Sequence, residues 1–200
     1  MKSFLLTLLF VSVTTLSFSQ EPAVETAKES VKDVDKKSTI EDGPELKWGV
    51  RGGINISNLD FDPDPTFENK HRNGFVFGAF VDYGISETFS ILAELQYSAE
   101  GAEAETLRAD YIQLPILFRF SLGEFFTVGA GPMVSLKTWG HNDGFSTFTF
   151  SGVAGLEYMI TDELFIDARV HYGFTNILDE DLTTQEAINT TIQFGFGLKI

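Results

Sequence analysis

From Lys47 to the end of the chain, apolar and polar residues alternate with a period of two. The alternation runs through eight stretches, at residues 47–57, 74–83, 89–98, 111–120, 126–137, 148–158, 164–173 and 188–200. Successive side chains of a β-strand point to opposite faces of its sheet, so each stretch predicts a strand with one apolar face. The sequence therefore predicts an all-β domain over residues 47–200, with eight antiparallel strands in up-and-down order.

The polar faces of these strands carry few charges, and the two signs nearly balance. The charged residues are Arg51, Arg119, Lys137, Arg169 and Lys199 against Asp82, Glu94, Glu157 and Asp167. A polar face that met water should carry more charges, most of them negative, because the chain has a net charge of −15. A narrow lumen filled by small residues and paired ions fits better. We therefore predict a transmembrane β-barrel whose apolar faces meet lipid and whose lumen holds these residues as a charge network.

The connections between the predicted strands alternate in length. Those at 84–88, 121–124 and 161–163 are tight, whereas those near 58–73, 100–109, 138–147 and 175–187 are long and polar. Outer-membrane barrels have short periplasmic turns and longer extracellular loops. The alternation thus predicts a barrel in the outer membrane of a Gram-negative bacterium, with its tight turns in the periplasm and its long loops outside.

Aromatic residues lie near the ends of the predicted outward faces. Trp48, Tyr83 and Tyr158 fall near the side of the tight turns, and Tyr97 and Tyr172 towards the side of the long loops. Such positions are typical of the aromatic girdles at membrane interfaces.

The first 46 residues differ from the rest of the chain. Lys2, an apolar stretch over residues 4–18 and small residues before Gln20 predict a signal peptide at 1–19. Residues 20–46 are charged and hold no aromatic residue, which predicts a disordered acidic periplasmic tail. Cleavage would remove Lys2 and no acid, so the net charge moves from −15 to −16. Such acidity argues against nucleic-acid binding, which needs a basic surface.

Four segments of the predicted barrel carry a family resemblance. GVRGGINIS, DYIQLPILFRF, VGAGP and the closing QFGFGLKI resemble the PorT-like, or porin-family, outer-membrane β-barrel domain over about residues 47–200. The resemblance implies a small barrel with periplasmic termini, in a family whose function is mostly unassigned. It would also account for Pro115 and Pro132, which strand interiors disfavour, and we predict bulges at both.

The C-terminus resembles the signal that the barrel-assembly machinery reads on a last strand. Gln193, Gly195, Leu198 and Ile200 match its polar, glycine and two spaced apolar positions. Ile200 stands where the usual signal has an aromatic residue. This resemblance implies the assembly machinery as a partner.

No group of residues predicts catalysis. His171 lies near Asp167 and Arg169 on an inward face, but no serine is placed to complete a triad, so packing is favoured over acid–base chemistry. An envelope enzyme acting on lipid would need a nucleophile beside His171, and the sequence offers none. We therefore predict no catalytic residue and no cofactor.

Two predicted loops are rich in carboxylates. They hold Asp60, Asp62 and Asp64 in the first and Asp179, Glu180 and Asp181 in the last. Oxygen-rich loops can hold a divalent cation, but the glycine and terminal glutamate of a calcium loop are missing. We predict solvated acidic loops and no resident metal. Outside the cell, these loops could contact lipopolysaccharide through bridging cations.

The sequence favours a non-enzymatic structural or interaction protein that acts through its extracellular loops, with its lumen plugged by side chains. The alternative is a low-conductance porin-like channel for small solutes. The expected partners are outer-membrane lipid, lipopolysaccharide and the assembly machinery. The sequence leaves the protein partner and the oligomeric state open.

Overall fold

The computed structural model describes residues 45–63, 65, 69–138, 144–178 and 186–200. The expected signal peptide and nearly all of the expected tail lie outside the described residues. The same is true of Asp64, Asp179, Glu180 and Asp181, on which the expected acidic loops partly rest. Within the described part of the chain, no helix is long and apolar enough to cross a membrane.

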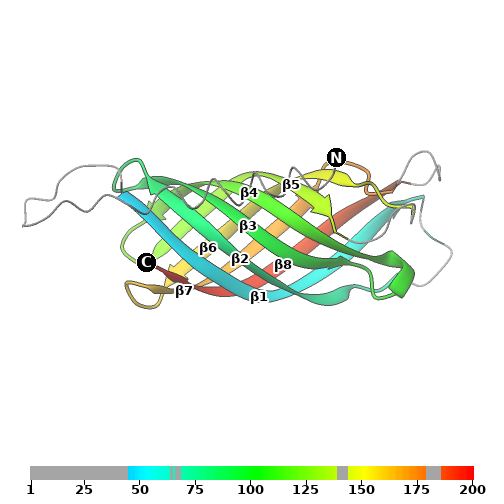
Figure 1. Ribbon diagram of the computed structural model, residues 1–200, viewed down its shortest axis with the longest axis horizontal. Coiled ribbons are helices and arrows are strands. Elements are labelled where there is room, and N and C mark those ends of the chain that lie inside the picture. Colours follow the sequence, from blue (N-terminus) through cyan, green and yellow to red (C-terminus); the bar gives the residue numbers. More distant parts are fainter. Residues whose placement is uncertain (1–44, 64, 66–68, 139–143, 179–185) are drawn as a thin grey trace, which may run out of the picture. The chain divides into compact units, whose positions relative to one another are not determined.

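The described chain forms eight strands that close into one antiparallel barrel (Figure 1). They are β1 (Glu45–Asp62), β2 (Arg72–Gly84), β3 (Phe89–Gly101), β4 (Arg108–Leu122), β5 (Phe126–Lys137), β6 (Phe148–Met159), β7 (Leu164–Gly173) and β8 (Glu186–Lys199). Each strand pairs with its neighbours in sequence, and β8 pairs with β1. A short 3₁₀ helix, η2 (Glu105–Leu107), lies between β3 and β4. The predicted eight-stranded up-and-down barrel is confirmed.

The period-two pattern divides each strand between the lumen and the outer surface. In β4, for example, Gln113 and Arg119 are buried, whereas Ile112, Phe118 and Phe120 are exposed. The same division holds along the other strands, so the outer wall is a continuous apolar surface rather than a water-facing polar one. Soluble monomers rarely expose so large an apolar surface.

The two ends of the barrel differ as the sequence predicted. One end, here called the turn end, has the tight connections 85–88, 123–125 and 160–163. The other, the loop end, has the long connections 63–71, 102–107, 138–147 and 174–185. At the turn end, Trp48 and Ile200 exchange two backbone hydrogen bonds of 2.9 and 2.7 Å, so the last residue is held against β1. The described barrel therefore begins and ends at its turn end.

Several strands extend beyond their predicted limits. β1 begins at Glu45, two residues before the expected boundary, and continues to Asp62, so Asp60 and Asp62 lie in a strand rather than in a loop. β3 also continues through Glu100 to Gly101. These extensions pair with neighbouring strands, and Asp62 stands opposite Glu186 across the β1–β8 ladder.

The bulges predicted at Pro115 and Pro132 are wrong. Pro115 stands opposite Met133, and three residues further on Phe118 stands opposite Ala130, so the register of β4 and β5 is the same on both sides of the interruption. A proline has no N–H to donate to the ladder. Pairing is interrupted at that point, but no extra residue is inserted.

Candidate functional site

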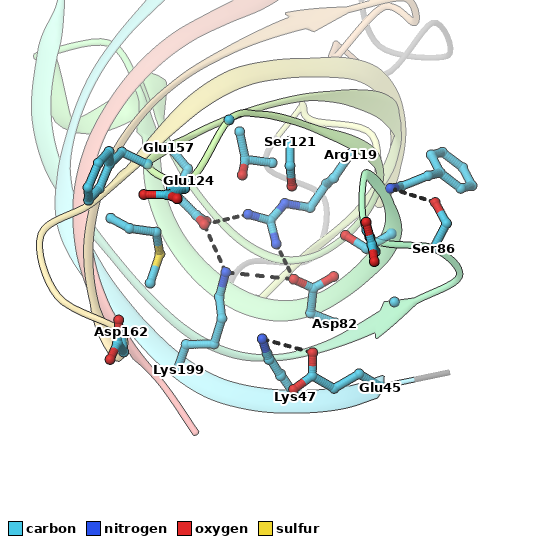
Figure 2. Close-up of a pocket in the computed structure, with 18 of the residues that line it drawn as sticks. Glu45, Lys47, Asp82, Ser86, Arg119, Ser121, Glu124, Glu157, Asp162 and Lys199 are labelled. Carbon is cyan, nitrogen blue, oxygen red and sulfur yellow. Dashed lines mark hydrogen bonds and ion pairs between the residues drawn. The ribbon is translucent and has the colours of Figure 1, made fainter. Parts of the chain in front are cut away.

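Four charged side chains meet in the lumen near the turn end. Asp82, Arg119, Glu157 and Lys199, called the turn-end ion cluster, come from β2, β4, β6 and β8. Arg119 donates to Asp82 and lies 2.5 Å from Glu157, while Lys199 Nζ lies 2.8 Å from Glu157 and 3.7 Å from Asp82 (Figure 2). Each cation thus contacts both anions, and the cluster is neutral.

A second neutral cluster lies deeper in the barrel. Arg51, Glu94, Asp167 and Arg169, called the central ion cluster, come from β1, β3 and β7. Arg51 Nε lies 2.9 Å from Asp167 and its Nη1 3.8 Å from Glu94. Arg169 lies 2.6 Å from Glu94 and 2.7 Å from Asp167. The even-numbered strands supply one layer of charges and odd-numbered strands the other, as in barrels whose alternate strands fill successive layers.

Apolar side chains pack around these ions. The buried cluster contains Phe80, Leu92, Leu117, Met133, Val153 and Phe165. The rings of Phe80 and Phe165 meet edge to face at 5.8 Å, and Lys199 Nζ lies 5.4 Å from the centre of the Phe165 ring. The Phe165 ring thus packs beside the turn-end ion cluster, two residues before Asp167 on β7.

Glycines provide the room that the bulky inward side chains occupy. A Cβ on Gly195 would lie 2.3 Å from Asp167 Oδ1 and 2.8 Å from Arg51 Nε. Likewise, a Cβ on Gly155 would lie 2.7 Å from Arg169 Cγ. Inward glycines are therefore the surfaces on which arginines and phenylalanines pack, since a Cβ on Gly197 would likewise lie 2.4 Å from the Phe165 ring.

In the loop half of the lumen, neutral polar side chains surround one buried carboxylate, Glu100. Gln96 donates to Gln113 over 2.7 Å, and Gln113 donates to Glu100 over 3.0 Å. Glu100 is buried and also accepts from Ser98 at 2.6 Å and Asn189 at 2.5 Å. Sequence reasoning missed Glu100 because it assigned residue 100 to a loop. Its place two residues after Ser98 on the inward face was the available signal.

His171 is buried beside this network. Neither ring nitrogen has a hydrogen-bond partner within the described residues, and the ring lines a cavity of about 10 Å³ together with Glu100. Asp167 and Arg169, its expected neighbours, are engaged in the central ion cluster. No three His, Cys, Asp or Glu residues of the described ranges group as metal ligands. The arrangement offers no acid–base pair built on His171.

The structure brings eight of the nine predicted lumen charges into the two clusters, each at most 9% exposed. It places Lys137 elsewhere, at the loop end of β5, where its Nζ lies 4.6 Å from the centre of the Phe145 ring. Phe145 belongs to an apolar cluster at that end, which also contains Leu59, Ala102, Ile177, Leu178 and Ala187. Lys137 shared the inward parity of its strand, but parity does not give depth in the barrel.

The predicted assembly residues divide between the two faces of β8. Gln193 is buried and accepts from Arg51 at 3.1 Å, and Gly195 faces the lumen beneath the same arginine. Leu198 and Ile200 point outward and are exposed. Gln193 and Gly195 thus have a packing role inside the barrel, whether or not the assembly machinery also recognises them.

A cavity of about 720 Å³ opens at the turn end, above the turn-end ion cluster (Figure 2). Its floor includes Asp82, Arg119, Glu157 and Lys199, and its rim includes residues of all three tight turns. We call it the turn-end cavity. Its volume far exceeds that of the cavity beside His171, which is about 10 Å³.

The closed barrel with an apolar outer wall and a charged lumen defines a transmembrane β-barrel protein. Residues 10–199 match the outer membrane protein beta-barrel domain, and the chain belongs to this family. The outer wall therefore meets lipid in the outer membrane. The family consists of barrel proteins rather than enzymes.

Solved structures share the fold. The attachment invasion locus protein Ail of Yersinia pestis is 16% identical, with a TM-score of 0.52, and the match covers 78% of this chain and 99% of Ail. Neisserial surface protein A is 15% identical, with a TM-score of 0.52, covering 76% and 97%. Comparison with curated protein sequences finds no match. These likenesses support the fold, and the PorT-like assignment stays a prediction.

The packing of Arg51 predicts a large difference between two glycines of neighbouring strands. Gly195→Ala should destabilise the barrel by about 1–3 kcal/mol, because the added methyl group must displace the Arg51–Asp167 pair. Gly52→Ala is the matched control, since its Cβ would lie no closer than 3.9 Å to any atom. Urea unfolding in lipid vesicles measures both. Equal stabilities for the two variants would contradict the packing role of Gly195.

Proposed function

We propose that this protein is a structural or interaction protein of the outer membrane, that its lumen is plugged by its own side chains, and that it acts through its loop end. The observation that carries the proposal is the central ion cluster. Arg51, Glu94, Asp167 and Arg169 are all buried and join strands from opposite sides of the lumen.

The charge balance of the lumen supports plugging. Buried charges are tolerated when they are paired, and removing one partner of such a pair costs about 3–5 kcal/mol. Both clusters pair two cations with two anions, so neither has a free charge to attract a permeating ion. An interior of eight strands is only wide enough for side chains. The apolar cluster around Leu59 and Phe145 adds a third obstruction at the loop end.

The orientation follows from the unequal ends. Outer-membrane barrels place short turns in the periplasm and long loops outside. On that rule the turn end, with Glu45 and Ile200, faces the periplasm. The loop end is then the surface presented to the exterior.

The turn-end cavity favours one alternative, a low-conductance channel for small solutes. It gives solvent access from one side as far as Asp82 and Arg119. For a channel, both ion clusters and the loop-end apolar cluster would have to rearrange during conduction.

Single-channel recording in planar bilayers separates the two functions. We expect no steady conductance from the purified barrel, and none from Arg119→Ala, because the central ion cluster lies beyond the residue removed. Steady conductance of the unmodified barrel would contradict plugging and support the channel. Conductance steps seen only with Arg119→Ala would show that the turn-end ion cluster alone closes the lumen. That result would contradict the proposal that the lumen is blocked at several depths.

Lipopolysaccharide is the partner proposed for the loop end. Asp62 and Glu186 stand opposite each other across the β1–β8 ladder, and like charges in that position repel. A divalent cation that bridges these carboxylates to lipid phosphates would offset the repulsion.

Limited trypsin cleavage tests this contact, since Arg108 is exposed at the loop end. In vesicles containing lipopolysaccharide and Mg²⁺, we expect trypsin to cleave more slowly after Arg108. Addition of EDTA should return cleavage to its faster rate, and so should the double variant Asp62→Asn, Glu186→Gln. Asp162→Asn at the turn end is the control and should leave the EDTA effect unchanged. An equal EDTA effect in vesicles of phospholipid alone would contradict the proposal.

The assembly machinery is the partner proposed for the last strand, through the outward residues Leu198 and Ile200. Their exposure on the completed barrel supports recognition, because no packing in the lumen requires them. Leu198→Asn should reduce the fraction of protein whose gel mobility shifts on boiling, which marks the inserted barrel. Leu46→Asn, also exposed at the turn end, is the control. Equal insertion of the two variants would remove Leu198 from the signal.

A further inference from the structure

The strand β4 loses its pairing on both edges, at adjacent positions in the barrel wall (Figure 1). Its ladder with β3 has no partners for Glu94 and Leu95, and its ladder with β5 has none for Gly131 and Pro132. The other ladders of the described barrel run without a break. Among the described strands, β4 is therefore the one whose neighbours hold it least firmly.

Two prolines account for both interruptions. In the registers of these ladders, Pro115 stands level with Glu94 and Pro132 with Ile116. A proline has no N–H, so neither residue can donate to the carbonyl group across the ladder. The backbones of β4 and β5 nevertheless touch, because a Cβ on Gly131 would collide with the carbonyl oxygen of Ile116. The wall is thus closed here by contact, without the hydrogen bonds of a ladder.

The interruption between β4 and β5 lies between two apolar surfaces. On the outer wall, Leu114 and Ile116 are exposed beside it. On the inner side, Leu117 and Met133 belong to the buried apolar cluster of the lumen. The hydrocarbon of a bilayer offers no water that could replace the missing bonds. Separation of the two strands at this point breaks fewer hydrogen bonds than elsewhere along the described wall, and it brings apolar side chains rather than ions into contact with lipid.

We infer that the wall opens laterally at β4, and that this opening gives the acyl chains of the surrounding lipid access to the apolar part of the lumen. Local opening is not uniform across a structure, and it is easiest where the stabilising contacts are fewest. The opening lies in the wall and not along the axis of the barrel. It therefore requires neither conduction through the lumen nor any contact of the loop end, and it stands apart from the function proposed above.

Thiol labelling in lipid vesicles tests the inference, because the sequence contains no cysteine and one introduced thiol reports on one position. Leu117→Cys places the thiol behind the interruption. Val153→Cys is the matched control, since Val153 faces the lumen from β6, is 3% exposed compared with 4% for Leu117, and lies between two continuous ladders. With a maleimide carried on the acyl chain of a phospholipid, we expect Leu117→Cys to react at least about tenfold faster than Val153→Cys.

Restoring the missing donors should keep the wall closed. Pro115→Ala with Pro132→Ala, introduced into the Leu117→Cys protein, should slow its labelling at least about fivefold, because each alanine supplies a backbone N–H to the ladder. The same two changes should leave the labelling rate of Val153→Cys unaltered. A gel mobility shift on boiling shows that each variant is folded, and Pro132→Ala alone provides the comparison if the double variant does not fold.

The inference is overturned if Leu117→Cys and Val153→Cys are labelled at equal rates, or if the alanines do not slow the labelling of Leu117→Cys. It is also overturned if a water-soluble maleimide labels Leu117→Cys as fast as the lipid-borne reagent does. That result would show that the thiol is reached through the turn-end cavity and not from the lipid.

Discussion

The narrow interior of a closed eight-stranded barrel is the constraint from which the other features of this protein follow. Beyond the turn-end cavity the interior is only wide enough for side chains, and the charges buried there need partners of opposite sign. Arginine side chains fit into this interior where the neighbouring strand has a glycine and so no side chain. Arg51 above Gly195 and Arg169 above Gly155 show the solution, in which each guanidinium reaches carboxylates on other strands.

The same constraint explains where the acidic charge of the chain is found. The net charge is −15, yet both ion clusters are neutral, and Glu100 is stabilised by neutral donors such as Gln113. Other carboxylates of the described residues, such as Glu87 and Glu124, lie at the rim of the turn end. The two ion clusters inside the lumen thus contain equal numbers of cations and anions, whereas water can screen the unpaired carboxylates at the rim.

Sequence reasoning found the faces of the strands because parity along a strand is a local property. It could not find which charges meet, since Arg51 and Asp167 are 116 residues apart and their contact depends on the register of several ladders. The sequence also did not give the position of each inward residue along the barrel axis. Lys137 was therefore grouped with ions that it does not reach. The strands end where pairing with a neighbouring strand ends, not where the sequence becomes polar. Glu100 was therefore assigned to a loop and missed as a lumen residue.

The two ends of the lumen are filled differently, and this difference bears on what the turn end does. At the loop end, inward positions and the nearby loops supply Leu59, Phe145 and Ile177, which pack into an apolar cluster. At the turn end, the inward positions outside the ion cluster include small residues such as Ser121 and Thr127, and a cavity remains. The cavity therefore gives access from the turn end only as far as the turn-end ion cluster, because the central ion cluster and the loop-end apolar cluster lie deeper in the barrel.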